Sequence, residues 1–297
     1  MGWATRKLLQ QRPADTVTIT FLAFLAVLTV FFYRSVPNAP ILVTLYLSLI
    51  LIQIILIRTK HKGKTIGVVY DLVFPTLCVL VVFDSLEWVV HYVNPRDIDP
   101  LLIRIDYLMF GSHPTVMLEK FMTPILTDFL QLAYSAYYFI PVSYGAILLL
   151  NRQQEEFNIS LFLILLCFYL SYLGYILFPA LGPRFYLDHL QTRELQGFLV
   201  AEPLMNLLNR LEGIKRDAFP SGHTAITLTV LYLSFKFRRM LFWIYLPIVA
   251  ALIFSAVYCR YHYVIDIIAG VGLTIFTIVT GEGYYRRWKG RHGVQYL

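Results

Sequence analysis

Charged residues are scarce in this chain of 297 residues. Asp, Glu, Lys and Arg make up 14% of it, hydrophobic residues make up 58%, and the mean hydropathy is +0.64. A soluble domain carries about a quarter charged residues. The scarcity of charge therefore excludes an ordinary soluble domain and predicts an integral membrane protein. The net charge of +7 then reflects cationic loops beside a membrane rather than binding of nucleic acid.

Cysteine is scarce as well. Cys78, Cys167 and Cys259 are scattered inside or beside apolar runs. Their spacing gives neither a metal-ligand pattern nor a disulfide framework. We interpret all three as packing residues, because a free cysteine behaves as a small apolar side chain. The sequence predicts no metal site and no cofactor.

Long apolar runs are abundant, and we predict eight membrane spans. A helix needs about 20 mostly apolar residues to cross a bilayer. The predicted spans are residues 16–33, 40–58, 66–83, 123–150, 159–179, 221–238, 241–258 and 262–283. The fold class that follows is an all-α integral membrane helix bundle with about eight transmembrane helices. The first run lacks a convincing signal-peptide cleavage site, which favours a retained span.

Loop charges orient these spans. With the N-terminus inside, the densest Lys and Arg clusters all fall on the inside, as the positive-inside rule requires. We predict that both termini are cytoplasmic, in a plasma membrane, with a bacterial inner membrane as the favoured case. Two long segments, 84–122 and 180–220, then lie outside. The first contains "DPLLIRIDYLMFG", whose apolar residues recur at helical spacing, which predicts a helix lying in the membrane interface.

Three polar clusters fall at the outer ends of predicted spans. They are "FPALGPRF" at 178–185, "RDAFPSGHT" at 216–224 and "YCRYHYVID" at 258–266. The predicted topology puts all three on one face of the membrane, although they are far apart in sequence. Polar residues at membrane depth usually have a function. We therefore expect an outward-facing site, at the periplasmic or external surface.

The second cluster is typical of an anion site. Ser221 is a good N-cap residue, and Gly222 allows a ligand to approach the backbone. The N-terminus of a helix binds anions through its free N–H groups and its dipole. Guanidinium and ammonium groups nearby match phosphate oxygens. Four cations are available for this role: Arg184, Lys215, Arg216 and Arg260.

Two histidines could then do the chemistry. His262 and Asp266 are four residues apart and would share one helix face. A carboxylate beside an imidazole fixes its tautomer and activates it as a nucleophile. His223 is a separate imidazole, suited to protonating a leaving oxygen. These groups predict a phosphoryl-transfer site that needs no metal.

This constellation resembles the type-2 phosphatidic acid phosphatase superfamily of membrane lipid phosphatases and phosphotransferases. The three sequence blocks of that family read roughly KxxxxxxRP, PSGH and SRxxxxxHxxxD. The second block is present in full as Pro220–His223, and the third is present at its functional end. The resemblance implies that His262 forms a phosphohistidine, Asp266 orients it and His223 is the general acid. It also implies that Ser221 and the Gly222 amide hold the phosphate.

The chain departs from the family blocks at two cationic positions. Leu177 stands where the first block has lysine, and Ala256 stands where the third block has arginine. Arg260 lies four residues after Ala256, so a helix would present its charge from the same face. Lys215 or Arg216 is a possible replacement for the missing lysine.

The departures point to a branch of the family. "LFPALGPRF", "RYHYVID" and the region 114–141 resemble the subgroup that contains inositol phosphorylceramide synthases. We predict a six-span phosphatase or phosphotransferase core at 66–297, preceded by an accessory two-span hairpin at 1–65. Asp71 and Asp128 fall within predicted spans, where a carboxylate is either functional or a packing partner.

Three functions follow as hypotheses. The favoured one is a metal-independent lipid phosphatase, which cleaves a phosphomonoester or pyrophosphate of a lipid. The second is a phosphotransferase, which passes the phosphoryl or phospho-headgroup to an alcohol acceptor. The third is a non-enzymatic lipid-binding or transport protein. The expected partners are a lipid phosphate substrate and the membrane, and no nucleic acid.

Overall fold

The computed structural model describes residues 11–205 and 215–292, and within these ranges every regular element is a helix. The predicted all-α class is therefore confirmed. Both chain termini, which we predict to be cytoplasmic, lie outside the described residues.

Six described helices are long and apolar enough to cross a membrane. They are α2 (Pro13–Phe31), α3 (Ala39–Thr59), the continuous run Lys64–Trp88, α11 (Gln154–Leu177), α15 (Arg239–Tyr258) and α16 (Val264–His292). The run Lys64–Trp88 comprises α4 (Lys64–Val68), the π-helix η1 (Val69–Val73), α5 (Phe74–Ser85) and η2 (Leu86–Trp88).

A seventh span is broken. Helices α9 (Pro124–Ser135) and α10 (Ile140–Leu150) meet at an angle of 49°, with the 3₁₀ turn η4 (Ala136–Tyr138) between them. The sixth predicted span, 221–238, corresponds to α14 (Gly222–Phe237), which has 16 residues and is shorter than a full span. The described part of the chain thus has six candidate spans, or seven with the broken one, rather than eight.

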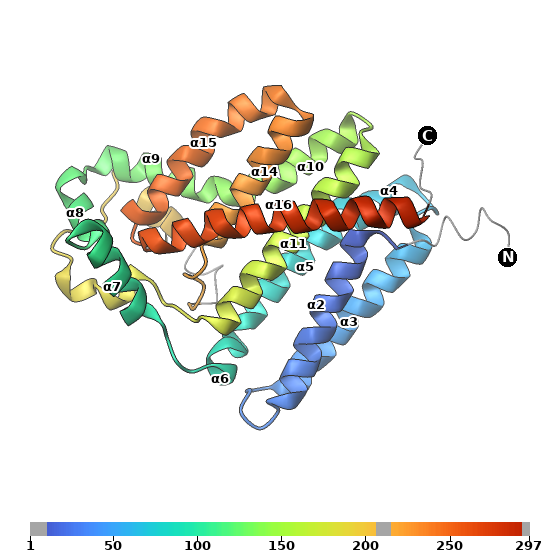
Figure 1. Cartoon of the computed structure of the whole chain (residues 1–297), viewed down its shortest axis with the longest axis horizontal. Helices are drawn as coiled ribbons and strands as arrows, with labels where there is room; N and C mark the ends of the chain where they lie inside the picture. Colours follow the sequence, from blue (N-terminus) through green and yellow to red (C-terminus); the bar gives the residue numbers. More distant parts are fainter. Residues whose placement is uncertain (1–10, 206–214, 293–297) are drawn as a thin grey trace.

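Helix α11 lies at the centre of the bundle and packs against α2, α10, α14 and α16. In Figure 1, α16 crosses in front of α11, and the short helices α7 (Asp99–Phe110) and α8 (Pro114–Met117) lie at one end of the bundle. The α2–α3 hairpin contacts α11 and α5. The division of the chain into a hairpin and a core remains a prediction.

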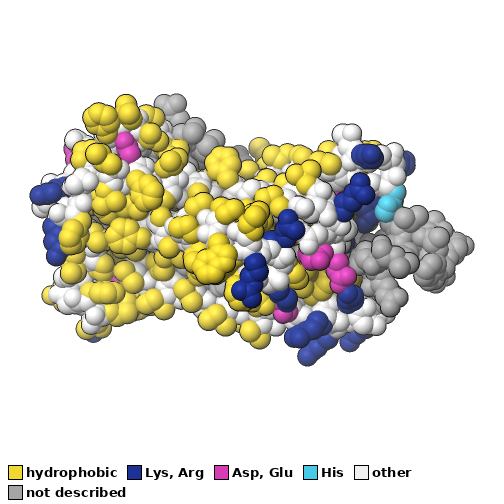
Figure 2. Space-filling model, turned by 90° about the horizontal axis from the view of Figure 1, so that it is seen from above, with side chains coloured by type: hydrophobic (Ala, Val, Ile, Leu, Met, Phe, Trp, Pro, Cys, Tyr) yellow, Lys and Arg dark blue, Asp and Glu magenta, His cyan; other side chains and the backbone are white. Residues whose placement is uncertain are grey.

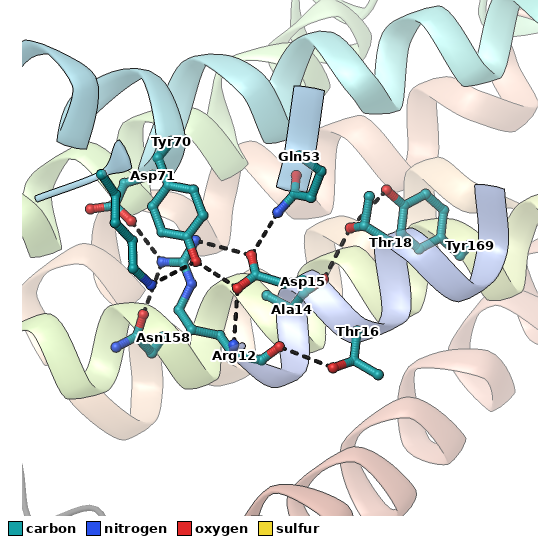
Figure 3. A network of polar contacts seen from close by, with 11 residues as sticks. Arg12, Ala14, Asp15, Thr16, Thr18, Gln53, Tyr70, Asp71, Asn158 and Tyr169 are labelled. Atoms are coloured by element: carbon teal, nitrogen blue, oxygen red, sulfur yellow. Dashed lines mark hydrogen bonds and ion pairs between the residues drawn. The ribbon is translucent and has the colours of Figure 1, made fainter. Parts of the chain in front are cut away.

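A buried polar network joins the hairpin to the rest of the bundle (Figure 3). The Arg12 guanidinium donates to Asp71 Oδ1 at 2.6 Å and to Asn158 Oδ1 at 3.1 Å. Asp15 accepts hydrogen bonds from the Tyr70 hydroxyl at 2.6 Å and from Gln53 at 2.7 Å. Asp71, the carboxylate predicted within the third span, is therefore an ion-pair partner of Arg12.

The surface is largely apolar. Figure 2 shows hydrophobic side chains over much of one face, with a few Lys and Arg side chains at its left end and more of them across its right half. Large side chains such as Phe31 and Leu150 are each 81% exposed. An apolar belt flanked by cations is what a surface in contact with a bilayer requires, so the described helices form an integral membrane protein.

Candidate active site

Backbone hydrogen bonds bring the three polar clusters together. The N–H of Ala218 donates to the Ala180 carbonyl at 3.1 Å, which joins the second cluster to the first. The N–H of Ser221 donates to the Asp266 carbonyl at 3.1 Å, which joins it to the third. Segments that are separate in sequence thus form one site, at the ends of α11, α14, α15 and α16.

The N-terminus of α14 forms one wall of this site. Ser221 is the N-cap, and its buried hydroxyl accepts a hydrogen bond from the Thr224 N–H at 3.3 Å. A Cβ atom at Gly222 would collide with the Tyr175 hydroxyl of α11. Glycine is therefore required here by the close packing of α14 on α11. The buried helix N-terminus presents the positive end of its dipole, which favours a bound anion.

His262 lies in the loop between α15 and α16. Helix α16 begins at Val264, so the prediction that His262 and Asp266 share a helix face is wrong. The two residues are nevertheless close, with 3.5 Å between His262 Nδ1 and Asp266 Oδ2. Nδ1 lies nearer to the Ala218 carbonyl oxygen, at 2.9 Å. A proton on Nδ1 is held by that carbonyl, which leaves Nε2 as the nitrogen with the free lone pair.

The surroundings of His262 keep its imidazole neutral at pH 7. Its pKa is lowered to about 4, mainly by burial; Asp217 and the Ala218 carbonyl act in the opposite direction, and Arg184 acts in the same direction as burial. The side chain is 2% exposed. An imidazole that is neutral and has one nitrogen fixed as a donor is in the state that a nucleophile needs.

Asp266 lies in the first turn of α16 and is completely buried. Its Oδ2 accepts a hydrogen bond from the Tyr263 N–H at 2.8 Å, which caps the start of the helix. Its Oδ1 is buried with no hydrogen-bond partner in the described part of the chain. The carboxylate is thus close enough to His262 to act on that ring through space.

His223 lies in the first turn of α14, opposite His262. The two ring centroids are 5.6 Å apart. His223 Nδ1 lies 3.2 Å from the Tyr134 hydroxyl oxygen, and its Nε2 is buried without a hydrogen-bond partner among the described residues. Nε2 is thus available to a ligand.

Two tyrosines that the sequence analysis missed enclose His223. The rings of Tyr134 and Tyr137 lie 4.4 and 4.1 Å from the His223 ring, and Tyr134 also stacks on Tyr261 at 4.2 Å. Both tyrosines lie at the break between α9 and α10. The only signal in the sequence is the aromatic run "AYSAYYF" at 133–139, inside what looks like one continuous span.

Arg184 and Arg260 lie beside Tyr261, the residue that precedes His262. Arg184 is in α12 (Pro183–Tyr186), with its guanidinium 5.2 Å from the Tyr261 ring centroid, and its N–H donates to the Arg260 carbonyl. Both arginines line a polar cavity of about 570 Å³. Its other polar lining residues are Asp188, Gln191, Glu194, Gln196, Glu202 and Tyr261.

The prediction that Arg260 presents its charge from the same helix face as Ala256 is wrong. Arg260 follows the end of α15 and has a left-handed backbone with φ of 65°. Its guanidinium pairs with Glu119 at 2.8 Å and donates to the Arg193 carbonyl at 2.5 Å. The charge of Arg260 is therefore largely compensated by Glu119.

The two remaining cationic candidates have other partners. Arg216 donates to both carboxylate oxygens of Asp97, at 2.7 and 3.2 Å. Lys215 is exposed, and its backbone N–H donates to Glu87. Neither side chain forms a hydrogen bond or ion pair with the histidines in the described part of the chain.

Helix α7 accepts hydrogen bonds from two segments of the site through two buried carboxylates. Asp99 accepts hydrogen bonds from both N–H groups of 181–182, at 2.9 and 2.8 Å. Asp106 accepts hydrogen bonds from both N–H groups of 264–265, each at 2.9 Å. Burial raises the pKa of both carboxyl groups. The predicted helix in the outer segment is therefore present, and its acidic face is turned towards the site.

Asp128 has a comparable role in another loop. It accepts hydrogen bonds from four consecutive N–H groups, those of 198–201, at 2.7 to 3.1 Å. Asp128, the second carboxylate that we predicted within a span, thus holds residues 198–201 in place through hydrogen bonds. Across residues 11–205 and 215–292, no group of three His, Cys, Asp or Glu side chains is arranged to hold a metal ion.

Comparison with protein families matches residues 101–280 to the PAP2 superfamily. The chain is also similar to a PA-phosphatase related-family protein of Dictyostelium discoideum, with 24% identity over 187 residues. That match covers 56% of this chain and only 34% of the relative, so the chain corresponds to about a third of that protein's length. No solved structure matches the chain.

Proposed function

Because the chain belongs to the PAP2 superfamily, we propose that it is a lipid phosphatase that hydrolyses a lipid phosphomonoester or pyrophosphate through a phosphohistidine. One observation carries this proposal. A neutral, buried His262 faces His223 across 5.6 Å at the N-terminus of α14. That gap lets one phosphoryl group reach both rings.

The first step forms the covalent intermediate. His262 Nε2 attacks phosphorus, and the bond from phosphorus to the lipid oxygen breaks. The Ala218 carbonyl holds the proton on Nδ1, and Asp266 stabilises the positive charge that His262 gains. The N-terminus of α14 and Arg184 stabilise the phosphoryl oxygens in the transition state.

His223 moves the proton in both steps. Its Nε2 gives a proton to the leaving lipid oxygen, so the lipid departs as an alcohol. His223 then takes a proton from water as the water oxygen attacks phosphorus. The bond between phosphorus and His262 breaks and free phosphate leaves, and the proton taken from water replaces the one that His223 gave to the lipid. Apart from the substrate and water, all groups in this scheme belong to the chain, and no step requires a metal.

One observation favours phosphotransfer as a second candidate. The cavity beside Arg184 and Arg260 is polar, and its carboxylates and amides are good partners for hydroxyl groups. An alcohol or polyol in that cavity would replace water as the acceptor. This agrees with the resemblance to inositol phosphorylceramide synthases. In either case, we propose that the site faces the outside of a plasma membrane.

The test is release of phosphate from a panel of lipid phosphates and pyrophosphates, with the purified protein in nanodiscs. We expect wild-type protein to release phosphate in the presence of chelator and the His262→Ala variant to release none. A new phospholipid formed only after addition of alcohol acceptors would favour transfer instead. Folded wild-type protein that is inactive in both assays would favour the non-enzymatic hypothesis.

A further inference from the structure

An apolar pocket lies beside His223, and neither Arg184 nor Arg260 is among its lining residues. It lies between the Lys64–Trp88 run, the broken span and α11. Its walls include Pro75, Val79, Phe83, Tyr138, Leu161 and Phe168, and His223 is part of its lining. A second, polar cavity lies beside the arginines. His223 lines the apolar pocket, and the polar cavity lies next to it through Tyr261, which stacks on Tyr134 beside His223.

The pocket is long and narrow. Its lining residues on α11 run from Phe157 to Tyr175, which corresponds to about 27 Å at about 1.5 Å per residue. Its volume is about 140 Å³. That volume spread over that length makes the pocket too narrow for two hydrocarbon chains side by side.

A buried ion pair lies at the end of the pocket far from His223. Asp71 is part of the lining there, and its carboxylate is paired with Arg12 from the start of α2. Gly145 of α10 lies beside this end, where a Cβ would meet Leu72 and Phe157 at 3.4 Å. A hydrocarbon chain that enters beside His223 therefore ends at the Arg12–Asp71 ion pair, with Gly145 and Leu72 close to it. We call this end the floor of the pocket.

We propose that this pocket binds one hydrocarbon chain of the leaving alcohol and that its floor limits the length of that chain. The proposal rests on the proposed function, because it assigns His223 to the leaving oxygen. The alcohol departs on the side of the general acid, and the compartment on that side is apolar. The substrate is thus a phosphate ester whose alcohol carries a hydrocarbon chain, which the protein surrounds instead of leaving in the bilayer.

The test uses octyl, dodecyl and hexadecyl phosphates as substrates, with the matching alkyl phosphonates as ligands that cannot be hydrolysed at the carbon–phosphorus bond. The Gly145→Leu variant fills the inner end of the pocket. Each methylene group that loses its place costs about fourfold in affinity. We therefore expect kcat/KM for hexadecyl phosphate to fall at least about tenfold, with octyl phosphate nearly unaffected.

The control is Gly272→Leu on α16, where nothing lies within 4 Å of an added Cβ. This variant should keep the wild-type preference for chain length. Leu72→Ala, which enlarges the inner end, should shift the preference towards longer chains even if Gly145→Leu does not fold. Equal chain profiles in the wild-type, Gly145→Leu and Leu72→Ala proteins would overturn the proposal.

The phosphonates separate this inference from the proposed function. The affinity for the phosphonates should rise with chain length, and Gly145→Leu should reduce this rise. That result supports the proposed role of the pocket even if the protein hydrolyses none of the phosphates. Hydrolysis that requires His262 but is indifferent to chain length in every variant would support the function and overturn the pocket.

Discussion

At the scale of single residues, the two histidines differ in which nitrogen is engaged. His262 has its Nδ1 beside the Ala218 carbonyl, whereas His223 has its Nδ1 beside the Tyr134 hydroxyl and a buried Nε2 with no partner among the described residues. On this difference we base the proposal that His262 is the nucleophile and that His223 transfers the proton.

This assignment predicts how the His223→Ala variant depends on the leaving group. Loss of a general acid costs about a hundredfold to ten-thousandfold in rate when the leaving group is an alkoxide. A nitrophenolate leaving group needs no proton, so phosphoryl transfer from 4-nitrophenyl phosphate should be far less impaired. The burst of nitrophenol in single-turnover experiments measures this step. Equal losses with alkyl and nitrophenyl phosphates would contradict the role of His223.

The lowered pKa of His262 predicts a stability that depends on pH. The pKa is about 4 in the folded protein and about 6.5 in an unfolded chain. The unfolded state therefore binds the proton more tightly, and the contribution of this group to stability is lost as the pH falls from about 6.5 to about 4. The loss amounts to up to about 3 kcal/mol.

Thermal unfolding in detergent checks this prediction between neutral and acidic pH. The His262→Asn variant should lose less stability on acidification than the wild type. His189 is exposed, so His189→Asn is a matched control that should behave as the wild type does. An unchanged pH dependence in His262→Asn would show that the folded protein tolerates a charged His262.

At the scale of elements, α7 has the reverse of the usual amphipathic arrangement. Its buried side carries Asp99 and Asp106, whereas Leu108 on its outer side is 74% exposed. The apolar outer side suits a lipid interface. The carboxylates fix the loop before Arg184 and the start of α16, next to His262. This helix therefore positions the site without contacting its reacting atoms.

Asp106→Asn tests this positioning role. An amide accepts fewer hydrogen bonds than a carboxylate and has no charge at the N-terminus of α16, so we expect a loss of about 1 kcal/mol in stability. We also expect kcat to fall several-fold with KM nearly unchanged, because His262 is less well held. The control is Arg104→Gln, on the exposed side of the same helix. A variant with wild-type kcat would limit Asp106 to a structural role.

The apolar runs and the PSGH block made much of this architecture predictable. The helical class and the meeting of the three clusters follow from span length and loop charge. The hydrogen-bond partners do not, because they depend on tertiary packing. Arg260 looks like a helical residue in sequence, yet it follows the end of α15 and pairs with Glu119, 141 positions earlier. The placement of Tyr134 and Tyr137 beside His223 could not be predicted for the same reason, because no sequence pattern marks the break in their span.

At the scale of the whole molecule, the Arg12 network ties the hairpin to the bundle from the end opposite α7. Arg12 has 7% of its side chain exposed, and its partners Asp15 and Asp71 have 1% and 17% exposed. Removal of one partner from a buried ion pair leaves an uncompensated charge and costs about 3–5 kcal/mol. We expect a loss of this size in the Arg12→Ala variant.

Thermal unfolding measures that loss, with Arg34→Ala in the exposed turn between α2 and α3 as the control. The double variant Arg12→Met, Asp71→Leu should recover part of the stability, because it removes both charges of the 2.6 Å ion pair and leaves Asp15 as the one uncompensated carboxylate of these three groups. If Arg12→Ala unfolds at the wild-type temperature, the network does not hold the hairpin to the core.

The central claim is that His262 carries the phosphoryl group during turnover. The most direct measurement is mass-spectrometric mapping of wild-type protein quenched in base during turnover of a lipid phosphate, because phosphohistidine survives base. We predict phosphate on the peptide containing His262, absent from His262→Asn and present in His223→Ala after reaction with 4-nitrophenyl phosphate. Turnover by wild-type protein without phosphate on His262, or with phosphate on another residue, would contradict the account.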